Sequence, residues 1–125
     1  MIDWQVQIDG QDPPDWDPHR DGCWFPDFDH QEYLLPVFDV GDSPIDPYGD
    51  TEFKEADLRR LRTHLRSFHA VFGGKPNSWS VTESSAVRST VLRLEREKVL
   101  AVVDKTLHMI EFALACRGSF VFCGD

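Results

Sequence analysis

The sequence predicts an α+β domain, with a small antiparallel or mixed sheet of about three strands and two to three helices packed on one face. Three observations predict this class. Residues 2–8 alternate apolar and polar side chains, residues 53–74 carry apolar side chains at helical spacing, and Phe120–Cys123 forms a short apolar segment near the end of the chain. The chain has 125 residues, a length suited to one hydrophobic core, so we expect a single domain over residues 1–125.

The first strand is predicted at residues 2–8, where the segment IDWQVQI has the period of two that is typical of a half-buried strand. Asp9-Gly10 ends it. The following residues are rich in Pro and Asp and have no helical period, which predicts a long acidic loop at about residues 9–31.

The next element is predicted at residues 32–40, with the sequence EYLLPVFDV. This segment is apolar over most of its length, and Pro36 would disrupt the interior of a helix because it lacks a backbone N–H. The segment therefore favours a strand, with Pro36 at an edge position or a bulge.

A turn and a long helix are predicted next. Asp46-Pro47-Tyr48-Gly49 has the residue preferences of a type I turn, and Asp50 or Thr51 would then cap the helix. Acidic residues come early in the helix and arginines later, as the helix dipole prefers, and Gly73-Gly74 ends it. The apolar face consists of Leu58, Leu61, Leu65, Phe68 and Phe72.

A second helical region is predicted over about residues 82–116. Ser80 and Glu83 have the spacing of a capping box, and neither Gly nor Pro occurs again until Gly118. The polar segment RLEREK in the middle leaves open one kinked helix or two short ones. A short buried strand at Phe120–Cys123 completes the predicted fold.

The charge is unevenly distributed along the chain. The net charge is −9, and residues 1–57 hold 16 Asp and Glu against Arg20 and Lys54, a net of −14. Residues 58–125 hold 6 acids against 11 bases, a net of +5. An acidic surface repels phosphate backbones and attracts a basic protein, so we expect a protein partner and no nucleic acid. Solubility alone is the competing explanation.

The cysteine content and the N-terminal segment indicate the cellular compartment of the protein. Three cysteines with no CxxC spacing, together with no basic-then-apolar segment at the N-terminus, indicate a reduced, cytoplasmic protein without a signal peptide. No apolar run approaches the roughly 18 residues of a membrane span, so no membrane association is expected.

No motif predicts a metal site, a cofactor or catalysis. The aspartates do not reproduce the spacing of a calcium loop, and His64 and His69 are five residues apart on one helix rather than four. The single local pairing of a nucleophile with a base is Cys23 with His19 or His30. A glycosidase-like pair of carboxylates also remains open, because acids are abundant. The sequence therefore favours a non-enzymatic role.

Aromatic residues are interleaved with the acids of the predicted loop. Either they fix the loop to the core, or they form a docking surface in which aromatics anchor a partner and carboxylates steer it. Rows of carboxylates that imitate DNA phosphates are another use of the same charge. The predicted partner-binding residues are Asp12, Asp15, Trp16, Asp17, Asp21, Trp24, Asp27, Phe28, Asp29 and Asp42.

Three short motifs resemble a known group of proteins. The segments Leu34–Phe38, Asp46–Thr51 and Phe120–Asp125 resemble those of small bacterial immunity proteins of polymorphic or contact-dependent toxin systems. The resemblance covers the last three quarters of the chain and includes no catalytic group. It implies a small cytosolic protein that binds and neutralises a toxin domain, or that is encoded in such a locus. The acidic charge of the chain, rather than the resemblance, points to a basic cleft on the cognate toxin domain.

The sequence thus predicts an immunity-like protein that binds a toxin domain. The alternatives are a small enzyme or metal-binding protein that uses carboxylates and histidines, and a homo-oligomer joined through an exposed strand edge near Pro36 or at the terminal strand.

Overall fold

A four-stranded antiparallel sheet forms the base of the molecule. The computed structural model describes residues 1–125, and the strand order is β2-β1-β6-β3. The last strand in the sequence, β6, lies between β1 and β3 and pairs with both. The four strands are β1 (Asp3–Gln7), β2 (Cys23–Trp24), β3 (Asp50–Phe53) and β6 (Ser119–Cys123). The predicted α+β class is confirmed, but the main sheet has four strands rather than about three.

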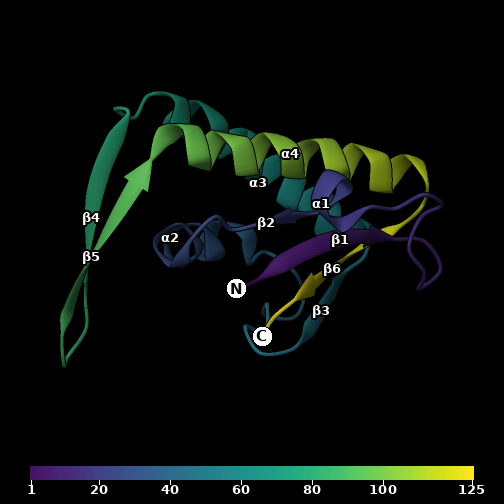
Figure 1. The fold of residues 1–125 in the computed structure, drawn as a ribbon, viewed down its shortest axis with the longest axis horizontal. Coiled ribbons are helices and arrows are strands. Elements are labelled where there is room, and N and C mark those ends of the chain that lie inside the picture. The colour runs from purple at the N-terminus through teal and green to yellow at the C-terminus, as the bar shows by residue number, and fades with distance from the viewer.

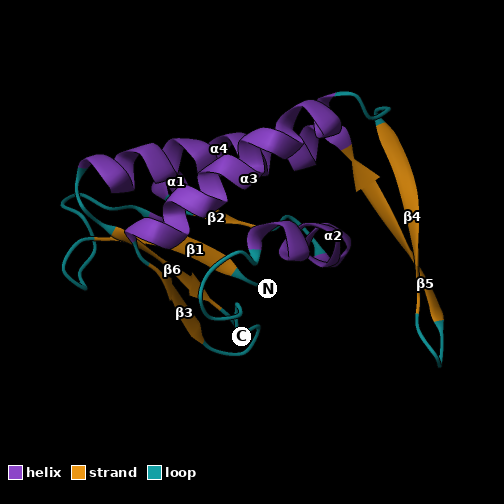
Figure 2. Cartoon of the chain, turned by 180° about the vertical axis from the view of Figure 1, so that it is seen from behind, coloured by secondary structure: helices purple, strands orange, loops and turns teal.

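The helices lie on one side of this sheet. The two long helices run side by side above it, and no helix covers the opposite face (Figure 1). Seen from behind, the same separation of helices and sheet is evident, with the shorter helix α2 next to a projecting β-hairpin (Figure 2). The helices are α1 (Pro18–Asp21), α2 (Phe28–Phe38), α3 (Glu55–Gly73) and α4 (Arg96–Ala115).

The hydrophobic core fills the space between the sheet and the helices. Trp4 is at its centre, and its ring contacts those of Phe25, Phe38 and Phe122 at centroid distances of 4.8–5.6 Å. The Trp4 indole N–H donates a hydrogen bond of 3.2 Å to Thr106 Oγ1 on α4, which satisfies the buried donor. The predicted face of α3 is confirmed, with Phe68 half-buried and the other four side chains fully buried: Leu58, Leu61, Leu65 and Phe72.

The prediction of a strand at residues 32–40 is wrong, because this segment belongs to helix α2. Asp27 caps the helix by accepting a hydrogen bond from the His30 backbone N–H at 2.9 Å. Pro36 lies in the last turn, where it removes a single helical hydrogen bond and faces solvent. Leu34 and Phe38, four residues apart, point into the core from one face of the helix.

The prediction of a helical region over residues 82–116 is correct only for its second half. Residues 78–95 form a hairpin of two strands, β4 (Ser78–Ser84) and β5 (Ser89–Glu95), which pair over seven residues each. Ser80 and Glu83 therefore lie in a strand and form no capping box. The reason is a period of two that the segment also carries, with Trp79 and Val81 in β4 facing Leu94 and Leu92 in β5.

Two further predictions are corrected. The segment predicted as a loop at about 9–31 contains α1, β2 and the first turn of α2. Asp50 and Thr51 do not cap a helix, because they belong to β3; helix α3 begins after Lys54, whose N–H donates to the Asp57 carboxylate at 3.2 Å. The turn at Asp46–Gly49 is confirmed by a backbone hydrogen bond from Gly49 N–H to Asp46 O at 3.5 Å.

Candidate functional site

The face of the sheet that no helix covers carries a defined set of side chains, which we call the open face. Strand register places Trp24, Asp3, Cys123 and Asp50 side by side in one row across the four strands. The next row contains Gln5, Val121 and Glu52, because alternate residues of a strand point to the same face. The open face is formed by Asp3, Gln5, Gln7, Trp24, Asp50, Glu52, Ser119, Val121 and Cys123.

The open face is acidic. Asp3, Asp50 and Glu52 are exposed, and the one basic side chain in contact with them is Lys54, whose Nζ lies 3.9 Å from Glu52. Asp12 joins this surface through a 3.2 Å hydrogen bond from Gln5 Nε2. A set of carboxylates with so few counter-charges gives this face a negative potential that attracts cations.

A groove of about 460 Å³ lies at one end of the open face, between the sheet and α1. Asp3 and Trp24 form its wall on the sheet, and Pro18 and His19 form its wall on α1. The His19 and Trp24 rings meet edge to face, with centroids 6.4 Å apart. The groove therefore offers an aromatic surface and a carboxylate together, which suits the side chain of a lysine or an arginine.

A second hollow of about 680 Å³ lies at the opposite end of the sheet. Its lining mixes acidic and basic groups from the ends of β1, β3 and α4 and from the start of α3, namely Asp9, Glu52, Lys54, Glu55 and Arg117. With one partly aromatic groove and one polar hollow, both open to solvent, the open face is a shallow surface rather than an enclosed cavity for a small molecule.

Cys123 lies between two carboxylates in the first row. Partial burial raises the pKa of its thiol to about 11, and the neighbouring charges of Asp3 and Asp50 act in the same direction. Burial also raises the pKa of Asp3, although the hydrogen bond with Cys123 opposes this effect. A thiol with a raised pKa stays protonated at neutral pH, so Cys123 is a hydrogen-bond donor to its neighbours and a poor nucleophile.

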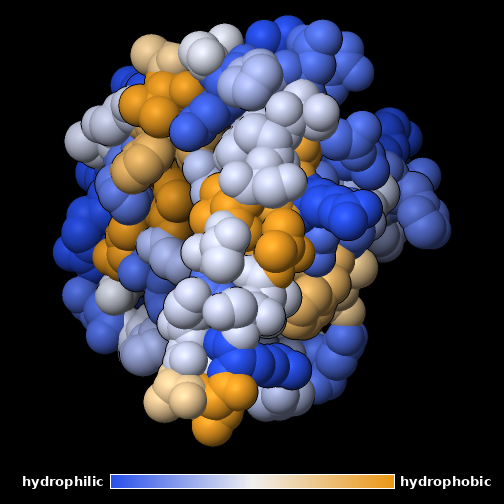
Figure 3. All heavy atoms as spheres, turned by 90° about the vertical axis from the view of Figure 1, so that its left-hand side faces the viewer, coloured by the Kyte–Doolittle hydropathy of each residue, from blue (hydrophilic) through white to orange (hydrophobic).

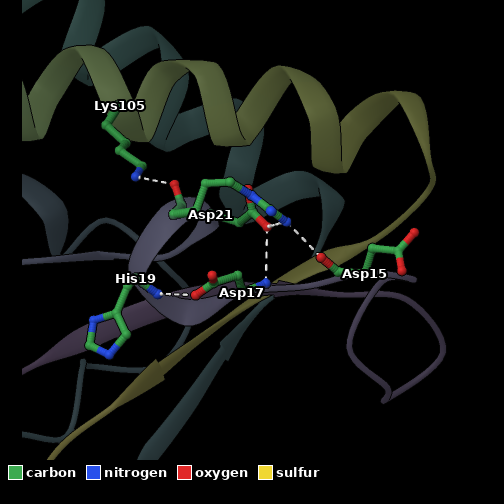
Figure 4. A network of polar contacts seen from close by, with 6 residues as sticks. Asp15, Asp17, His19, Asp21 and Lys105 are labelled. Atoms are coloured by element: carbon green, nitrogen blue, oxygen red, sulfur yellow. Dashed lines mark hydrogen bonds and ion pairs between the residues drawn. The ribbon is translucent and has the colours of Figure 1, made fainter.

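Several of the acids predicted to bind a partner instead hold the backbone in place (Figure 4). Asp17 caps α1, and Asp21 accepts hydrogen bonds from the Asp17 backbone at 3.0 Å and from the Arg20 guanidinium at 2.7 Å. The hydrogen bond from Arg20 is the main reason that the pKa of Asp21 falls to about 2. Arg20 also donates to the Asp15 carbonyl, and Lys105 donates to the Arg20 carbonyl at 2.6 Å, which joins this network to α4.

The other predicted acids have comparable roles. Asp27 caps α2, and Asp29 accepts a hydrogen bond from the Arg93 backbone N–H at 3.0 Å, which fastens the hairpin to α2. The Asp42 carboxylate pairs with Arg60 at 2.9 Å. Of the predicted acids, Asp15 makes no side-chain hydrogen bond, and Asp12 makes one only with Gln5.

The three predicted aromatic residues lie in different environments. Trp16 packs against the core and its indole N–H is buried without a partner. Trp24 is 46% exposed on the open face, and Phe28 is 58% exposed at the start of α2 next to the hairpin. The structure thus does not gather the predicted residues into one patch, and it places Trp24 among acids that sequence reasoning did not select.

Sequence reasoning missed the acids of the open face, Asp3, Asp50 and Glu52. The signal was present in the strand pattern itself, since Asp3 occupies a polar position of the alternating segment 2–8. Asp50 and Glu52 have no such signal, because the sequence predicts that a helix begins in their segment, whereas the structure has strand β3 there.

The structure contains no group of three or more His, Cys, Asp or Glu side chains placed to hold a metal ion. The buried imidazole of His30 is held on both sides, by the Asp27 carboxylate at 2.7 Å from Nδ1 and by the Glu95 backbone N–H, which donates to Nε2 at 3.1 Å. Cys23 contacts Thr106, and burial raises the pKa of its thiol. The Cys23–histidine pairing considered from the sequence is therefore not formed.

Comparison of the chain with protein family models, curated proteins and solved structures gives no match. None of the helices combines the length and apolar character that crossing a membrane requires.

Proposed function

We propose that this chain is an immunity-like protein, which binds and neutralises a bacterial toxin domain by docking its open face against a basic cleft of the toxin. The observation that carries the proposal is the row of Trp24, Asp3 and Asp50 across a sheet face that no helix covers. The proposed interface is an acidic surface with an aromatic residue, as the sequence predicts, but it is centred on this face rather than on the segment 12–29.

Trp24 is the anchor of the proposed interface. Large aromatic side chains at the centre of an interface contribute much of the binding energy, and a cation over a tryptophan ring adds to it. Trp24 is exposed beside Asp3, at the mouth of the groove that α1 completes. An arginine or lysine of the toxin would place its charge near Asp3 and its aliphatic stem against the indole ring.

The acids of the open face supply steering. Asp3, Asp50, Glu52 and Asp12 lie on the same side of the sheet as Trp24, and opposite charges on the partner accelerate association. The proposal places the protein in the cytoplasm, where its three free thiols stay reduced. Two of the segments that resemble immunity proteins contact each other at the edge of this face. The Gly124 N–H donates to the Gly49 carbonyl at 2.9 Å, which joins the 46–51 turn to the terminal segment.

Co-expression with the product of the gene adjacent to that of this chain, tested as the candidate toxin, tests the proposal. The native chain should restore growth and bind the purified toxin domain, whereas Asp3→Lys and Glu52→Lys should each weaken binding about tenfold, more strongly at low salt. Trp24→Ala should cost about 2 kcal/mol of binding free energy or more.

Matched controls separate the open face from general effects of charge and hydrophobicity. Glu97→Lys makes the same charge change on an exposed residue of α4, and Phe112→Ala removes an aromatic ring that is 43% exposed on the same helix. Both variants should bind and protect like the native chain. A chain that binds no toxic partner, or loses binding equally in the controls, contradicts the proposal.

A further inference from the structure

The β4–β5 hairpin extends beyond the body of the molecule at the end away from β1 and β3 (Figures 1 and 2). Its two outer edges are unlike each other. On β5, the outward N–H of Arg93 donates to Asp29 at 3.0 Å and that of Glu95 donates to His30 at 3.1 Å. Helix α2 therefore closes the β5 edge with two side chains.

The outer edge of β4 has no such cover. In an antiparallel ladder, opposite residues alternate between pairs that exchange hydrogen bonds and pairs whose N–H and C=O groups point outward. Ser80 is opposite Arg93, whose N–H points outward to α2, so the backbone groups of Ser80 point outward on the other side. By the same alternation, the backbone N–H and C=O groups that point outward from β4 belong to Ser78, Ser80, Thr82 and Ser84. None of these four N–H groups makes a hydrogen bond outside the ladder.

Natural proteins protect exposed strand edges by shortening them or by placing Lys, Pro or charged residues there. The edge strands of the main sheet follow this rule, since β2 has two residues and β3 carries Asp50 and Glu52. Strand β4 is seven residues long, with the sequence SWSVTES, and has no Pro, no Lys and a single charge at Glu83. It is an unprotected edge of full length.

The surface of this end of the molecule fits an interface. Several groups of hydrophobic residues are exposed on this face, separated by pale and hydrophilic residues (Figure 3). Two of the exposed aliphatic side chains of the protein belong to the hairpin, Val91 at 53% and Val87 at 90% exposure.

The sequence of β4 is complementary to itself when two copies run antiparallel. With a twofold axis through Val81, the outward groups of Ser80 meet those of Thr82 in the other copy, so all seven residues pair. Val81 then lies opposite Val81 of the second copy, and Trp79 lies opposite Glu83. No like charges face each other, and a β-branched pair lies at the axis, which favours pairing.

Neighbouring registers are less favourable. If the axis shifts by one residue, to Ser80 or Thr82, residues with outward-pointing groups still meet each other and can exchange hydrogen bonds. The shift leaves two residues of each β4 strand unpaired, however. The full-length register is therefore the preferred one.

From the open edge and its self-complementary register, we infer that two copies of this chain associate through β4, which forms a continuous four-stranded sheet in the order β5-β4-β4-β5. This interface is separate from the open face of the main sheet and does not depend on the proposed toxin binding. An isologous contact of this kind closes on itself as a dimer and leaves both open faces free.

Light scattering of the purified chain over a range of concentrations tests the inference. The expected mass is twice the chain mass of 14.4 kDa at high concentration and falls to that of one chain on dilution. Thr82→Pro removes an outward N–H without touching the β4–β5 ladder, and should weaken the dimer roughly tenfold or more. Thr82→Ala keeps the N–H and should dimerise like the native chain.

A cross-link gives the register and does not depend on how the proline variant folds. In a background with Cys116→Ser and Cys123→Ser, Val81→Cys should form a disulfide-linked dimer on oxidation, because opposite residues of a pair that exchanges no hydrogen bonds are close enough to bridge. Val91→Cys, in the other strand of the hairpin, should not.

Three results would overturn the inference: a monomer at every concentration, a dimer that Thr82→Pro leaves at full strength, or a cross-link at residue 91 in preference to 81. Protection of the β4 amides from hydrogen exchange only when a toxin domain is added would assign the edge to that partner instead.

Discussion

The Asp29 carboxylate accepts a hydrogen bond of 3.0 Å from the backbone N–H of Arg93, a residue 64 positions later in the chain. This contact ties the first turn of α2 to the outer edge of β5. An aspartate that reads as part of an acidic docking surface thus has a structural role: it satisfies a strand edge and positions the hairpin. Its neighbour His30 does the same for Glu95.

Loss of this contact should loosen the hairpin. Asp29→Ala leaves the Arg93 N–H without a partner at the strand edge, so we expect faster hydrogen exchange at that amide and a loss of about 1 kcal/mol in the free energy of unfolding. Exchange measured by NMR, together with urea unfolding, checks both values. Glu32→Ala, which removes a carboxylate that makes no hydrogen bond on the same helix, should change neither, and an equal effect in both variants would contradict the assigned role.

The buried hydrogen bond between Trp4 and Thr106 should matter more than its single contact suggests. Thr106→Val keeps the shape but leaves the Trp4 indole N–H unpaired in the core, which should cost about 1–3 kcal/mol in unfolding free energy. Thr106→Ser retains the hydroxyl and should lose less. Thermal or urea unfolding of the two variants gives the comparison, and a larger loss in Thr106→Ser than in Thr106→Val would show that packing of the methyl group, rather than the hydrogen bond, is the main effect.

The division of the acidic segment into caps and free carboxylates is also testable. Asp27→Ala removes the cap of α2 and the partner of the His30 ring, and we expect a loss of about 1–2 kcal/mol in unfolding free energy. Asp12→Ala, whose carboxylate accepts one exposed hydrogen bond from Gln5, should stay within about 0.5 kcal/mol of the native chain. Urea unfolding measures both, and a similar loss at Asp12 would contradict the division.

The parts of the fold that the sequence predicts are those with one dominant period. Strand 2–8 and helix 53–74 each have an apolar repeat that local propensity supports, and the structure has both, as β1 and α3. Residues 32–40 have neither clear period. Pro36 does not exclude a helix there, because proline in the last turn of a helix removes a single backbone hydrogen bond. Tertiary packing of Leu34 and Phe38 decides that segment.

The candidate site could be predicted only in part, for a physical reason. The number of aspartates is visible in the sequence, but whether a carboxylate caps a helix or faces solvent depends on backbone groups that tertiary structure brings to it. Asp29 meets Arg93 only because the hairpin folds back onto α2. The row of Trp24, Asp3 and Asp50 likewise exists only because β1 and β6 place three separate segments side by side.

The position of Cys123 between Asp3 and Asp50 gives a prediction for alkaline pH. Its thiol has a pKa of about 11 in the folded protein, against an ordinary value of 9.0, because burial and the two carboxylates disfavour the thiolate. Between these two pH values the unfolded chain releases the Cys123 proton while the folded chain retains it, so the free energy of unfolding should fall as pH rises through this window. Below pH 9 the contribution is fully present.

Cys123→Ser isolates this contribution, because serine does not titrate in the same range and the other thiols are unchanged. Urea unfolding of both proteins across the window should show a steeper loss of stability with pH in the native chain than in the variant. Alkylation should also be slow at Cys123 until the pH approaches 11. Two results would contradict this prediction: stability curves that run parallel with pH, or alkylation of Cys123 that is complete well below pH 9. Either would show that the two carboxylates do not hold the thiol in its protonated form. The first row of the open face would then be more loosely packed than the register of the strands requires.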